Sequence, residues 1–369
     1  MPRKIKIGFV GCGNILNQYV LGCRRYDVLE IVACASLHGT SAHTKAAEHG
    51  IPRSCTVDEL LAMPDIDLVI NLTVPAAHVA VNEAALRAGK HIYAEKPFAL
   101  DSRGGARVLA LAQERGLLVG CAPDTFLGGG LQTARKLLDD GAVGRPVAAF
   151  AFMLCHGHEH WHPSPEFYYA QGGGPMFDMG PYYFTALIGL LGPVARVTGM
   201  AKTSITERTI TSQPLAGKKI NVTVPTHYAS TAEFANGTVA SLVLSFDVWP
   251  GPVLPRIVIY GTEGTLELPD PNRFDGEVRL YRPGVKEPQV IAHTHSIARG
   301  RGTGVADMAY SILRRERPHR ASGELANHLV EVMEAFDLAS AEGQQIGIGS
   351  VCARPAALPT GLADNVLDA

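Results

Sequence analysis

The chain has 369 residues, of which 46% are hydrophobic, and a formal net charge of −2 at pH 7. At roughly 100–200 residues per domain, this length accommodates two packed domains. Charges of both signs are interspersed along the chain, which excludes nucleic acid and an anionic membrane surface as the main partners.

The seven cysteines and the first residues indicate a cytoplasmic protein. The cysteines form neither a CxxC pair nor a Cys/His pattern with zinc spacing, which is typical of reduced thiols. The opening MPRKIKIGFVGCGN enters a strand rather than a signal peptide, and no apolar run reaches the ~18 residues of a membrane span. We therefore expect a soluble protein with no membrane partner and no metal.

The first predicted elements are a strand, a glycine-rich turn and a helix over residues 4–25. Gly11 and Gly13 fill the first two positions of a GxGxxG pattern, and Leu16 occupies the third. The first two glycines let the backbone approach a pyrophosphate at the helix N-terminus, whereas the third serves helix packing. This stretch predicts a dinucleotide-binding turn.

Strands and helices then alternate up to residue 123. The predicted strands are 29–36, 65–75, 91–97 and 117–123, and the predicted helices are 40–50, 76–90 and 102–116. Such alternation predicts an α/β fold with a doubly wound parallel sheet, whose ligand lies at the carboxyl ends of the strands. Glu95 and Lys96 follow one of these strands directly, so we expect them to line a cofactor crevice.

The end of the second strand carries Ser36 where a carboxylate normally binds the ribose hydroxyls of NAD. Without that carboxylate, the 2′-phosphate of NADP could be accepted by Ser36, His38, Thr40 or Lys45. The loop has no arginine, however. In the alternative interpretation, the cofactor is NAD and this loop simply makes fewer contacts to its ribose. We expect NAD(P)(H) as cofactor, with a preference for NADP.

Four segments of this first part resemble the Gfo/Idh/MocA oxidoreductases, the glucose-fructose oxidoreductase and inositol dehydrogenase-like enzymes. These segments are VGCGN, NLTVPAAH, RAGKH and AEKPFALD, and GGGPMFDMGPYYFTALIGLLGP at residues 172–193 is similar to the second hallmark of the family. The resemblance implies a Rossmann domain over 1–122. It also implies an α/β substrate-binding and oligomerisation domain over 123–369, built on a large open mixed, mostly antiparallel sheet.

The resemblance also implies a hydride transfer between a nicotinamide and a carbinol or keto carbon of a sugar, cyclitol or related polyol. Lys96 takes the position that polarises the reacting oxygen; the alternative is a surface lysine paired with Glu95. The residues expected at the cofactor are Gly11, Gly13, Asn14, Ile15, Ser36, Thr73, Pro75, His78, Glu95, Lys96, Pro97 and Asp124.

The family's Asp and His, four residues apart, correspond here to Asp178 and Tyr182. The imidazole is therefore missing at the second position. A tyrosine beside a lysine can exchange a proton when the nearby cation lowers its pKa from about 10. We expect Lys96, Asp178 and Tyr182 to be catalytic; in the alternative interpretation Tyr182 only packs.

The segment HGHEHWHPSPEFYYAQGGG, residues 156–174, is dense in histidine and aromatic groups. Histidines at every second position of a strand would share one face and could bind a metal. Its prolines and glycines favour a substrate loop instead. The expected sugar-stacking residues are Trp161, Tyr168 and Tyr169, and the candidates for the missing proton relay are His158, His160 and His162.

Thr125, next to Asp124 in CAPDTFLGGG, is expected to bind substrate together with Trp161, His162, Asp178 and Tyr182. The strand-rich second half predicts an open sheet with a face available for a homo-oligomer, either a dimer or a tetramer. Arg299 and Arg301 are candidates for an anionic group or a partner subunit, or else lie on a solvated surface.

Two other functional classes remain open at this level. An NAD-dependent glycosidase or lyase would use transient sugar oxidation with a retained cofactor. A non-catalytic, cofactor-binding regulatory protein is disfavoured because Lys96 is present. The predicted function is an NAD(P)-dependent sugar or polyol dehydrogenase or reductase.

Overall fold

The computed structural model describes residues 3–249, 251, 253–314 and 317–367, which form two compact units. Unit 1 comprises Met1–Gly129, Thr294–Asn327 and Ala356–Ala369, and unit 2 comprises Gly130–His293 and His328–Pro355. The sequence predicted a single boundary at 122/123. The chain instead returns to unit 1 at Thr294, and again at Ala356.

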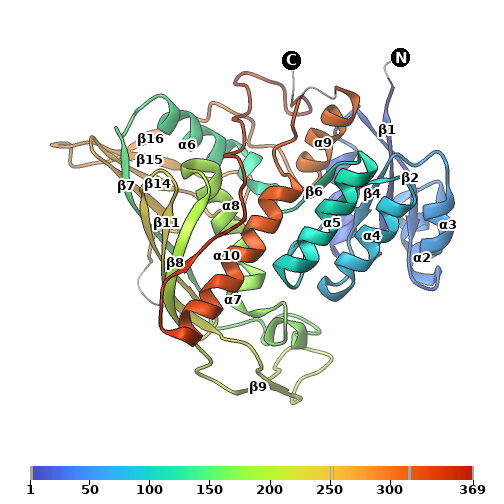
Figure 1. The fold of residues 1–369 in the computed structure, drawn as a ribbon, viewed down its shortest axis with the longest axis horizontal. Helices are drawn as coiled ribbons and strands as arrows, with labels where there is room; N and C mark the ends of the chain where they lie inside the picture. Colours follow the sequence, from blue (N-terminus) through green and yellow to red (C-terminus); the bar gives the residue numbers. More distant parts are fainter. Residues whose placement is uncertain (1–2, 250, 252, 315–316, 368–369) are drawn as a thin grey trace. The chain divides into compact units, whose positions relative to one another are not determined.

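Unit 1 is built on a parallel sheet of six strands in the described residues, in the order β3-β2-β1-β4-β5-β6 (Figure 1). The strands are β1 (Ile5–Val10), β2 (Leu29–Ala35), β3 (Arg53–Cys55), β4 (Leu68–Asn71), β5 (His91–Ala94) and β6 (Val119–Cys121). The helices and 3-10 turns of this unit are α1 (Ile15–Cys23), α2 (Thr40–His49), α3 (Val57–Ala62), η1 (Pro75–Ala77), α4 (His78–Arg87), α5 (Ser102–Arg115), η2 (Thr125–Leu127) and α9 (Thr303–Leu313). The doubly wound parallel sheet predicted from the alternation is confirmed.

The order of this sheet reverses between β1 and β4, the central pair of strands. Both strands are almost entirely buried, since helices cover a parallel sheet on both faces. Ligands of such sheets bind outside the carboxyl ends of the strands at this switch point. The turns after Val10 and Asn71 are therefore the place where a cofactor site is expected.

Residues 294–327 belong to unit 1 through contacts that are remote in sequence. The hydroxyl groups of Tyr26 and Thr303 lie 2.8 Å apart, and a ring nitrogen of His319 lies 2.8 Å from the Val119 carbonyl oxygen. An isolated bridge also joins Gly120 to Ser322. These contacts connect the turn after α1, β6 and the segment around α9, which explains the discontinuous unit.

Unit 2 contains a sheet of nine strands in its described part, in the order β16-β15-β14-β13-β7-β12-β11-β8-β17. Its strands are β7 (Pro146–Leu154), β8 (Val194–Lys202), β11 (His227–Phe234), β12 (Val239–Ser245), β13 (Ile257–Gly261), β14 (Thr265–Leu268), β15 (Val278–Tyr281), β16 (Gln289–Ile291) and β17 (Ile346–Gly347). Within the described chain, β7 and β12 form the one parallel pair of this sheet, and its other neighbours are antiparallel. The large mixed, mostly antiparallel sheet is confirmed.

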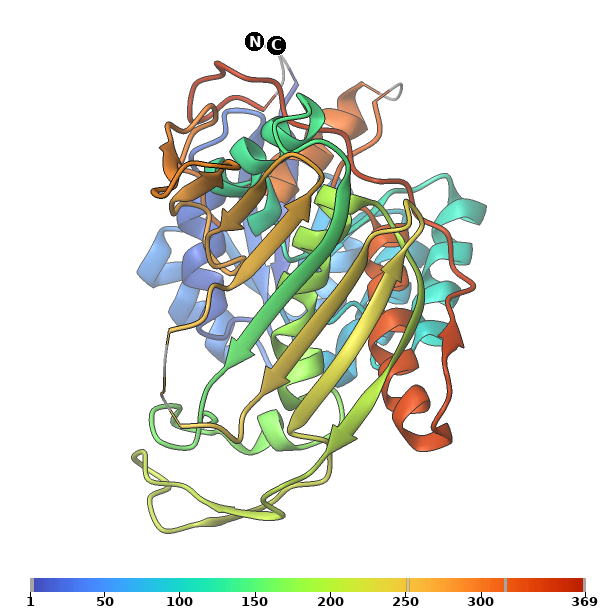
Figure 2. The same ribbon diagram turned by 90° about the vertical axis from the view of Figure 1, so that its left-hand side faces the viewer.

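The remaining elements of unit 2 are a small ribbon and the helices of one sheet face. They are β9 (Glu207–Thr209), β10 (Lys219–Asn221), α6 (Gly129–Asp139), η3 (Glu166–Tyr169), α7 (Gly174–Asp178), α8 (Gly180–Leu191) and α10 (Gly323–Glu342). The first residues of α6 and α10, Gly129 and residues 323–327, belong to unit 1. Figure 2 turns the other face of the sheet toward the viewer, with α8 behind it. The side chains that β7, β8, β12 and β13 expose include Phe150, Met200, Val239 and Tyr260. No helix in the described residues is long and apolar enough to cross a membrane.

Candidate active site

The glycine turn after β1 has the geometry that a dinucleotide requires. Gly11 has a φ of 103°, and a Cβ at this position would lie 2.6 Å from the backbone of Leu72. Only glycine fits such a backbone approach and a positive φ together. Gly13 and Asn14 are exposed at the start of α1, whose first residue is Ile15. The free backbone at this helix N-terminus fits the pyrophosphate of a dinucleotide.

The segment after β4 is held by a buried amide network. The Asn71 side chain accepts hydrogen bonds from the backbone N–H and the hydroxyl of Thr73, and it donates to Asn82. Asn71 and Asn82 are both fully buried. This network fixes Thr73 and leads the chain into η1, which begins at Pro75.

Glu95 is buried, so it does not form a solvent-exposed ion pair with Lys96. Its two oxygens accept hydrogen bonds from the Tyr19 hydroxyl at 2.7 Å and from the backbone N–H of Lys96 at 2.9 Å. Lys96 itself is half-buried, directly after β5. Glu95 therefore anchors the backbone that carries the lysine side chain.

His78 links the segments that follow β4 and β5. Its Nδ1 lies 2.7 Å from the carbonyl oxygen of Pro97, and its Nε2 lies 3.0 Å from that of Thr73. The side chain is fully buried, and this burial lowers the pKa of His78 despite the two carbonyl groups. A neutral imidazole has a single N–H, so one of these two contacts is a hydrogen bond at a time. The surroundings of the His78 side chain do not support the predicted contact with the cofactor. The side chain instead positions the two loops around Lys96.

Ser36 follows β2 and is half-buried. Its hydroxyl oxygen accepts a hydrogen bond from the backbone N–H of Ala42 at 3.2 Å, within the first turn of α2. Lys45 forms an ion pair with Glu48 at 2.6 Å and donates to Asn17 at 3.0 Å. The lysine considered as a phosphate contact therefore already has two acceptors.

Asp124 and Thr125 are buried within unit 1. The Asp124 Oδ2 accepts hydrogen bonds from the backbone N–H groups of Gly302 and Gly304, and its Oδ1 lies 3.5 Å from Arg301 Nη1. Burial raises the pKa of Asp124, while Arg301 and the Gly304 N–H act in the opposite direction. The direct ligand contacts predicted for Asp124 and Thr125 are thus not supported, because both side chains are buried and Asp124 binds the backbone at the start of α9.

Arg299 and Arg301 are not exposed in unit 1. Arg299 is 5% exposed and donates to the carbonyl group of Leu127. Its burial lowers the pKa of its guanidinium group. The interpretation of both arginines as residues of a solvated surface is wrong.

In unit 2, an imidazole faces Asp178 from the histidine-rich loop. The His158 Nε2 lies 3.3 Å from the Asp178 Oδ2, and the Trp161 indole N–H donates to the His158 Nδ1 at 3.2 Å. An indole nitrogen can only donate, so neutral His158 carries its proton on Nε2, toward Asp178. The contact has ion-pair length, although Nε2 has no well-aligned hydrogen bond within the described residues.

Asp178 and Tyr182 do not share one uninterrupted helix. α7 ends at Asp178 and α8 begins at Gly180, with Met179 between them at φ −107°. Tyr182 lies in the first turn of α8 and is 6% exposed. The sequence predicted that Asp178 and Tyr182 lie one turn apart on the same helix. In the structure, the helix is interrupted directly after Asp178.

The four histidines of the loop have different surroundings, because β7 ends at Leu154, before the first of them. His160 is exposed, while His162 is half-buried and accepts a hydrogen bond from the Ser164 N–H. Burial lowers the pKa of His162. Across the described residues, no group of three or more His, Cys, Asp or Glu side chains has the arrangement of a metal site.

A buried charge cluster, which the sequence did not predict, holds this loop through Glu159. Arg208 binds Glu159 at 2.6 Å and Asp247 at 2.5 Å, and all three are almost completely buried. Tyr169 is fully buried and donates its hydroxyl to Glu159, so it does not offer the sugar-stacking surface expected of it. Burial acts to raise the pKa of Glu159, but the hydrogen bonds from Tyr169 and Arg208 outweigh it and lower that pKa.

Taken unit by unit, the fold and the glycine turn define a dinucleotide-binding protein, and the comparisons identify its family. The sequence model described as "Oxidoreductase family, NAD-binding Rossmann fold" matches residues 5–122, and the GFO/IDH/MocA C-terminal domain matches residues 131–267. Together they cover more than half of the chain. The protein belongs to the Gfo/Idh/MocA oxidoreductases.

Similar relatives and solved structures extend over most of the chain. The 1,5-anhydro-D-fructose reductase of Ensifer adhaerens is 27% identical over 76% of this chain and 87% of that enzyme. The dTDP-3,4-didehydro-2,6-dideoxy-alpha-D-glucose 3-reductase of Saccharopolyspora spinosa is 28% identical over 84% of this chain and 92% of that enzyme. The structure of levoglucosan dehydrogenase in complex with NADH shares the fold, with a TM-score of 0.80 at 19% identity, covering 95% of this chain and all of the other.

Proposed function

We propose that this enzyme transfers a hydride between NAD(P) and a carbinol or keto carbon of a sugar, cyclitol or related polyol. The observation that carries the proposal is the position of Lys96 directly after β5, with the backbone on either side fixed. Glu95 binds the Lys96 N–H, and His78 lies 2.7 Å from the Pro97 carbonyl oxygen. A cation that is held in place at a strand end can stabilise negative charge on a reacting oxygen without reorganisation.

The cofactor fits the glycine turn of unit 1. Gly11 and Gly13, with Asn14 and Ile15 at the start of α1, would hold the pyrophosphate, and Thr73 and Pro75 would line the adjacent loop. Bound NAD(P) supplies the acceptor or donor of the hydride. The preference for NADP is part of the proposal and rests on the uncharged Ser36 at the end of β2.

Asp178 and Tyr182 act on the substrate hydroxyl groups in this proposal. Asp178 binds a hydroxyl, and the Tyr182 hydroxyl exchanges the proton of the reacting oxygen. His158 is a positioning residue, because Trp161 orients its ring and its Nε2 faces Asp178. It places an imidazole beside Asp178 although the family's histidine position holds Tyr182. Trp161 and His162 of the same loop complete the substrate contacts.

The enzyme is further proposed to be a cytoplasmic homo-oligomer that associates through the open face of the unit 2 sheet. All seven cysteines lie among the described residues and are free thiols, which fits a reducing compartment. The exposed Phe150, Met200 and Tyr260 supply apolar area on that face. Phe150→Lys should shift the enzyme to a smaller species in size-exclusion chromatography, whereas an unchanged elution volume would exclude this face.

The direct test is a panel of sugars and cyclitols incubated with NAD or NADP, followed by the absorbance of reduced nicotinamide. We expect stoichiometric reduction with at least one member of the panel. If a glycoside is hydrolysed while added NAD(P) is neither required nor reduced, the enzyme is a glycosidase with a retained cofactor, and the proposal is wrong.

A further inference from the structure

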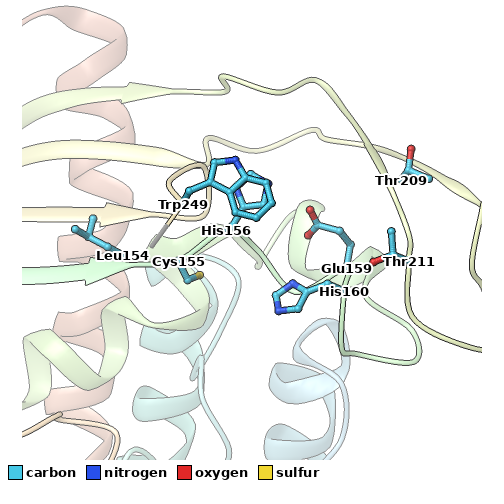
Figure 3. A pocket seen from close by; sticks show the side chains of 8 residues that line it. All are labelled: Leu154, Cys155, His156, Glu159, His160, Thr209, Thr211 and Trp249. Carbon is cyan, nitrogen blue, oxygen red and sulfur yellow. The ribbon is translucent and has the colours of Figure 1, made fainter. Parts of the chain in front are cut away.

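Unit 2 contains a cavity of about 610 Å³ at the end of β7, beside the histidine-rich loop. The residues that line it are Leu154, Cys155, His156, Glu159, His160, Thr209, Thr211 and Trp249. Figure 3 shows Glu159 between the Trp249–His156 pair and Thr211. The volume falls within the roughly 300–1,000 Å³ of sites that enclose drug-sized ligands.

One wall of this cavity is a stacked aromatic pair. The rings of His156 and Trp249 are 3.6 Å apart between centroids and 18° from parallel. Trp249 is 73% exposed, and the buried Nδ1 of His156 has no hydrogen-bond partner in the part of the chain that the structure describes. An exposed indole beside an unsatisfied ring nitrogen suits a ring that is apolar on its face and polar on its edge.

The polar groups of the cavity disfavour an anionic ligand. Arg208 is shared between the carboxylates of Glu159 and Asp247, which leaves one carboxylate more than cations, and the cavity adds the hydroxyl groups of Thr209 and Thr211. No lysine or arginine is among the eight lining residues, all of which are described. A nucleoside diphosphate, which needs cations or backbone donors for its phosphates, does not match this lining.

His158 lies on the same loop but is directed elsewhere. It contacts Asp178, Trp161 and Tyr168, whereas His156, Glu159 and His160 line the cavity. The loop thus serves two places, and each has its own aromatic surface. A two-ring substrate can present one ring to each of these aromatic surfaces.

We propose that the cavity beside Trp249 binds the second ring of a neutral glycoside, so that the substrate is a disaccharide or an aryl glycoside. This inference rests on the proposed sugar oxidoreductase activity, with the reacting ring at Asp178. The second ring stacks on Trp249, and its edge is within reach of Glu159, His160 and the two threonines.

The first arm of the test measures binding without turnover. The chain has two tryptophans, and Trp161 belongs to the proposed substrate contacts, so the fluorescence of the wild type is compared with that of Trp249→Phe. The wild-type fluorescence should respond to cellobiose, maltose, lactose or phenyl β-D-glucoside at concentrations about 10-fold lower than to glucose, galactose or methyl β-D-glucoside, and Trp249→Phe should lose this difference. A response to phenyl glucoside alone would identify an aromatic second ring, and a response to the disaccharides a sugar.

The second arm measures kcat/KM for the same probes by the absorbance of reduced nicotinamide. Trp249→Ala should lower the ratio of kcat/KM between two-ring and one-ring probes by about 10-fold or more. Val253→Ala is the matched control, since Val253 lies in the same connection, is 98% exposed and does not line the cavity. The control should keep the wild-type ratio. Because Trp249 is exposed, its loss leaves the core intact.

The outcomes separate this inference from the proposed function. Turnover of one-ring probes with an unchanged ratio in Trp249→Ala, or a fluorescence response that does not favour two rings, would overturn the second-ring subsite and leave the activity standing. A two-ring fluorescence response without nicotinamide reduction by any probe would keep the subsite and overturn the activity. Failure in both arms would contradict both.

Discussion

The Nε2 of His158 lies 3.3 Å from the Oδ2 of Asp178, and the opposite nitrogen of the same ring is occupied by the Trp161 indole N–H. The Trp161 hydrogen bond sets the tautomer and the orientation of the ring, and the proton on Nε2 then faces Asp178. Of the three histidines considered for a proton relay, only His158 has this relation to Asp178 among the described residues. The imidazole that is missing at position 182 has a counterpart in His158, which lies beside Asp178.

His158→Gln keeps a side-chain donor near Asp178 but removes the imidazole ring. We expect kcat/KM to fall by about 10- to 100-fold, since a poorly held Asp178 misplaces the substrate. The stability of the variant, measured by urea unfolding, should stay at the wild-type level, which separates positioning of Asp178 from loss of packing. A lower activity that is accompanied by an equal loss of stability would reduce His158 to a structural residue.

Tyr182→Phe removes one hydroxyl group and little volume. We expect kcat to fall by ~10²–10⁴-fold with a modest change in KM, the usual contribution of a positioned general acid. Steady-state kinetics over a range of pH would measure it. Full activity of this variant would make Tyr182 a packing residue, as its low exposure also permits.

Lys96→Ala removes the cation after β5 while Glu95 and His78 keep the local backbone. Turnover should decrease by at least ~10²-fold, as for the loss of one electrostatic stabiliser. The affinity for the cofactor, measured by the fluorescence of NAD(P)H on binding, should stay within about one order of magnitude. Lys96→Arg is the control that retains the charge and should keep more activity than alanine. Normal turnover without the lysine would remove Lys96 from the chemistry.

Ser36→Asp places a carboxylate at the end of β2. It supplies an acceptor for the ribose hydroxyls of NAD and repels a 2′-phosphate, so the ratio of kcat/KM for NADP over NAD should decrease. The new carboxylate can still accept the Ala42 N–H that Ser36 accepts now. A constant ratio would show that this loop does not contact the ribose and that the proposed NADP preference is wrong.

Acid should destabilise the fold through buried histidines. Burial lowers the pKa of His78, His319 and His328 in the folded protein. Below about pH 6.5 the unfolded chain therefore binds more protons, and the free energy of unfolding decreases as the pH falls toward the folded pKa values. Each group contributes at most ~1.4 kcal/mol per pH unit.

The contribution of His78 can be isolated with His78→Gln. Urea unfolding between neutral and mildly acidic pH should show a weaker loss of stability in the variant than in the wild type. His319 and His328 are present in both proteins. Their contributions to the pH dependence therefore cancel when the unfolding free energies of the wild type and the variant are subtracted. Equal pH dependence would mean that His78 is not neutral when folded.

The first half of the fold could be predicted because its signals are local. The apolar runs around Val10 and Ile70 and the turn at Gly11 and Gly13 are each readable within a few residues. The return of residues 294–327 to unit 1 was not predictable, because it depends on contacts such as Tyr26 with Thr303, which are 277 residues apart. The burial of Asp124 under the Gly302 and Gly304 N–H groups was missed for the same reason.

The site in unit 2 was predicted only in part. The histidine-rich segment was visible, but a pattern of alternate histidines does not say which one meets Asp178; the end of β7 at Leu154 and the Trp161 contact decide it. Arg208 is 49 residues from Glu159 and gave no signal of its own. Trp249, one of two tryptophans, stands in the proline-rich sequence VWPGPVLP, which indicates an aromatic side chain on a loop. This signal could have pointed to the cavity.

The central claim is a net hydride transfer between a sugar or polyol and NAD(P). The most direct measurement compares the amount of reduced nicotinamide with the amount of oxidised sugar, for the wild type and for Lys96→Ala. The account predicts one equivalent of NAD(P)H per oxidised carbinol carbon, and a rate that drops sharply in the variant. Product formation without any net reduction of added NAD(P), or an equal rate in Lys96→Ala, would contradict it.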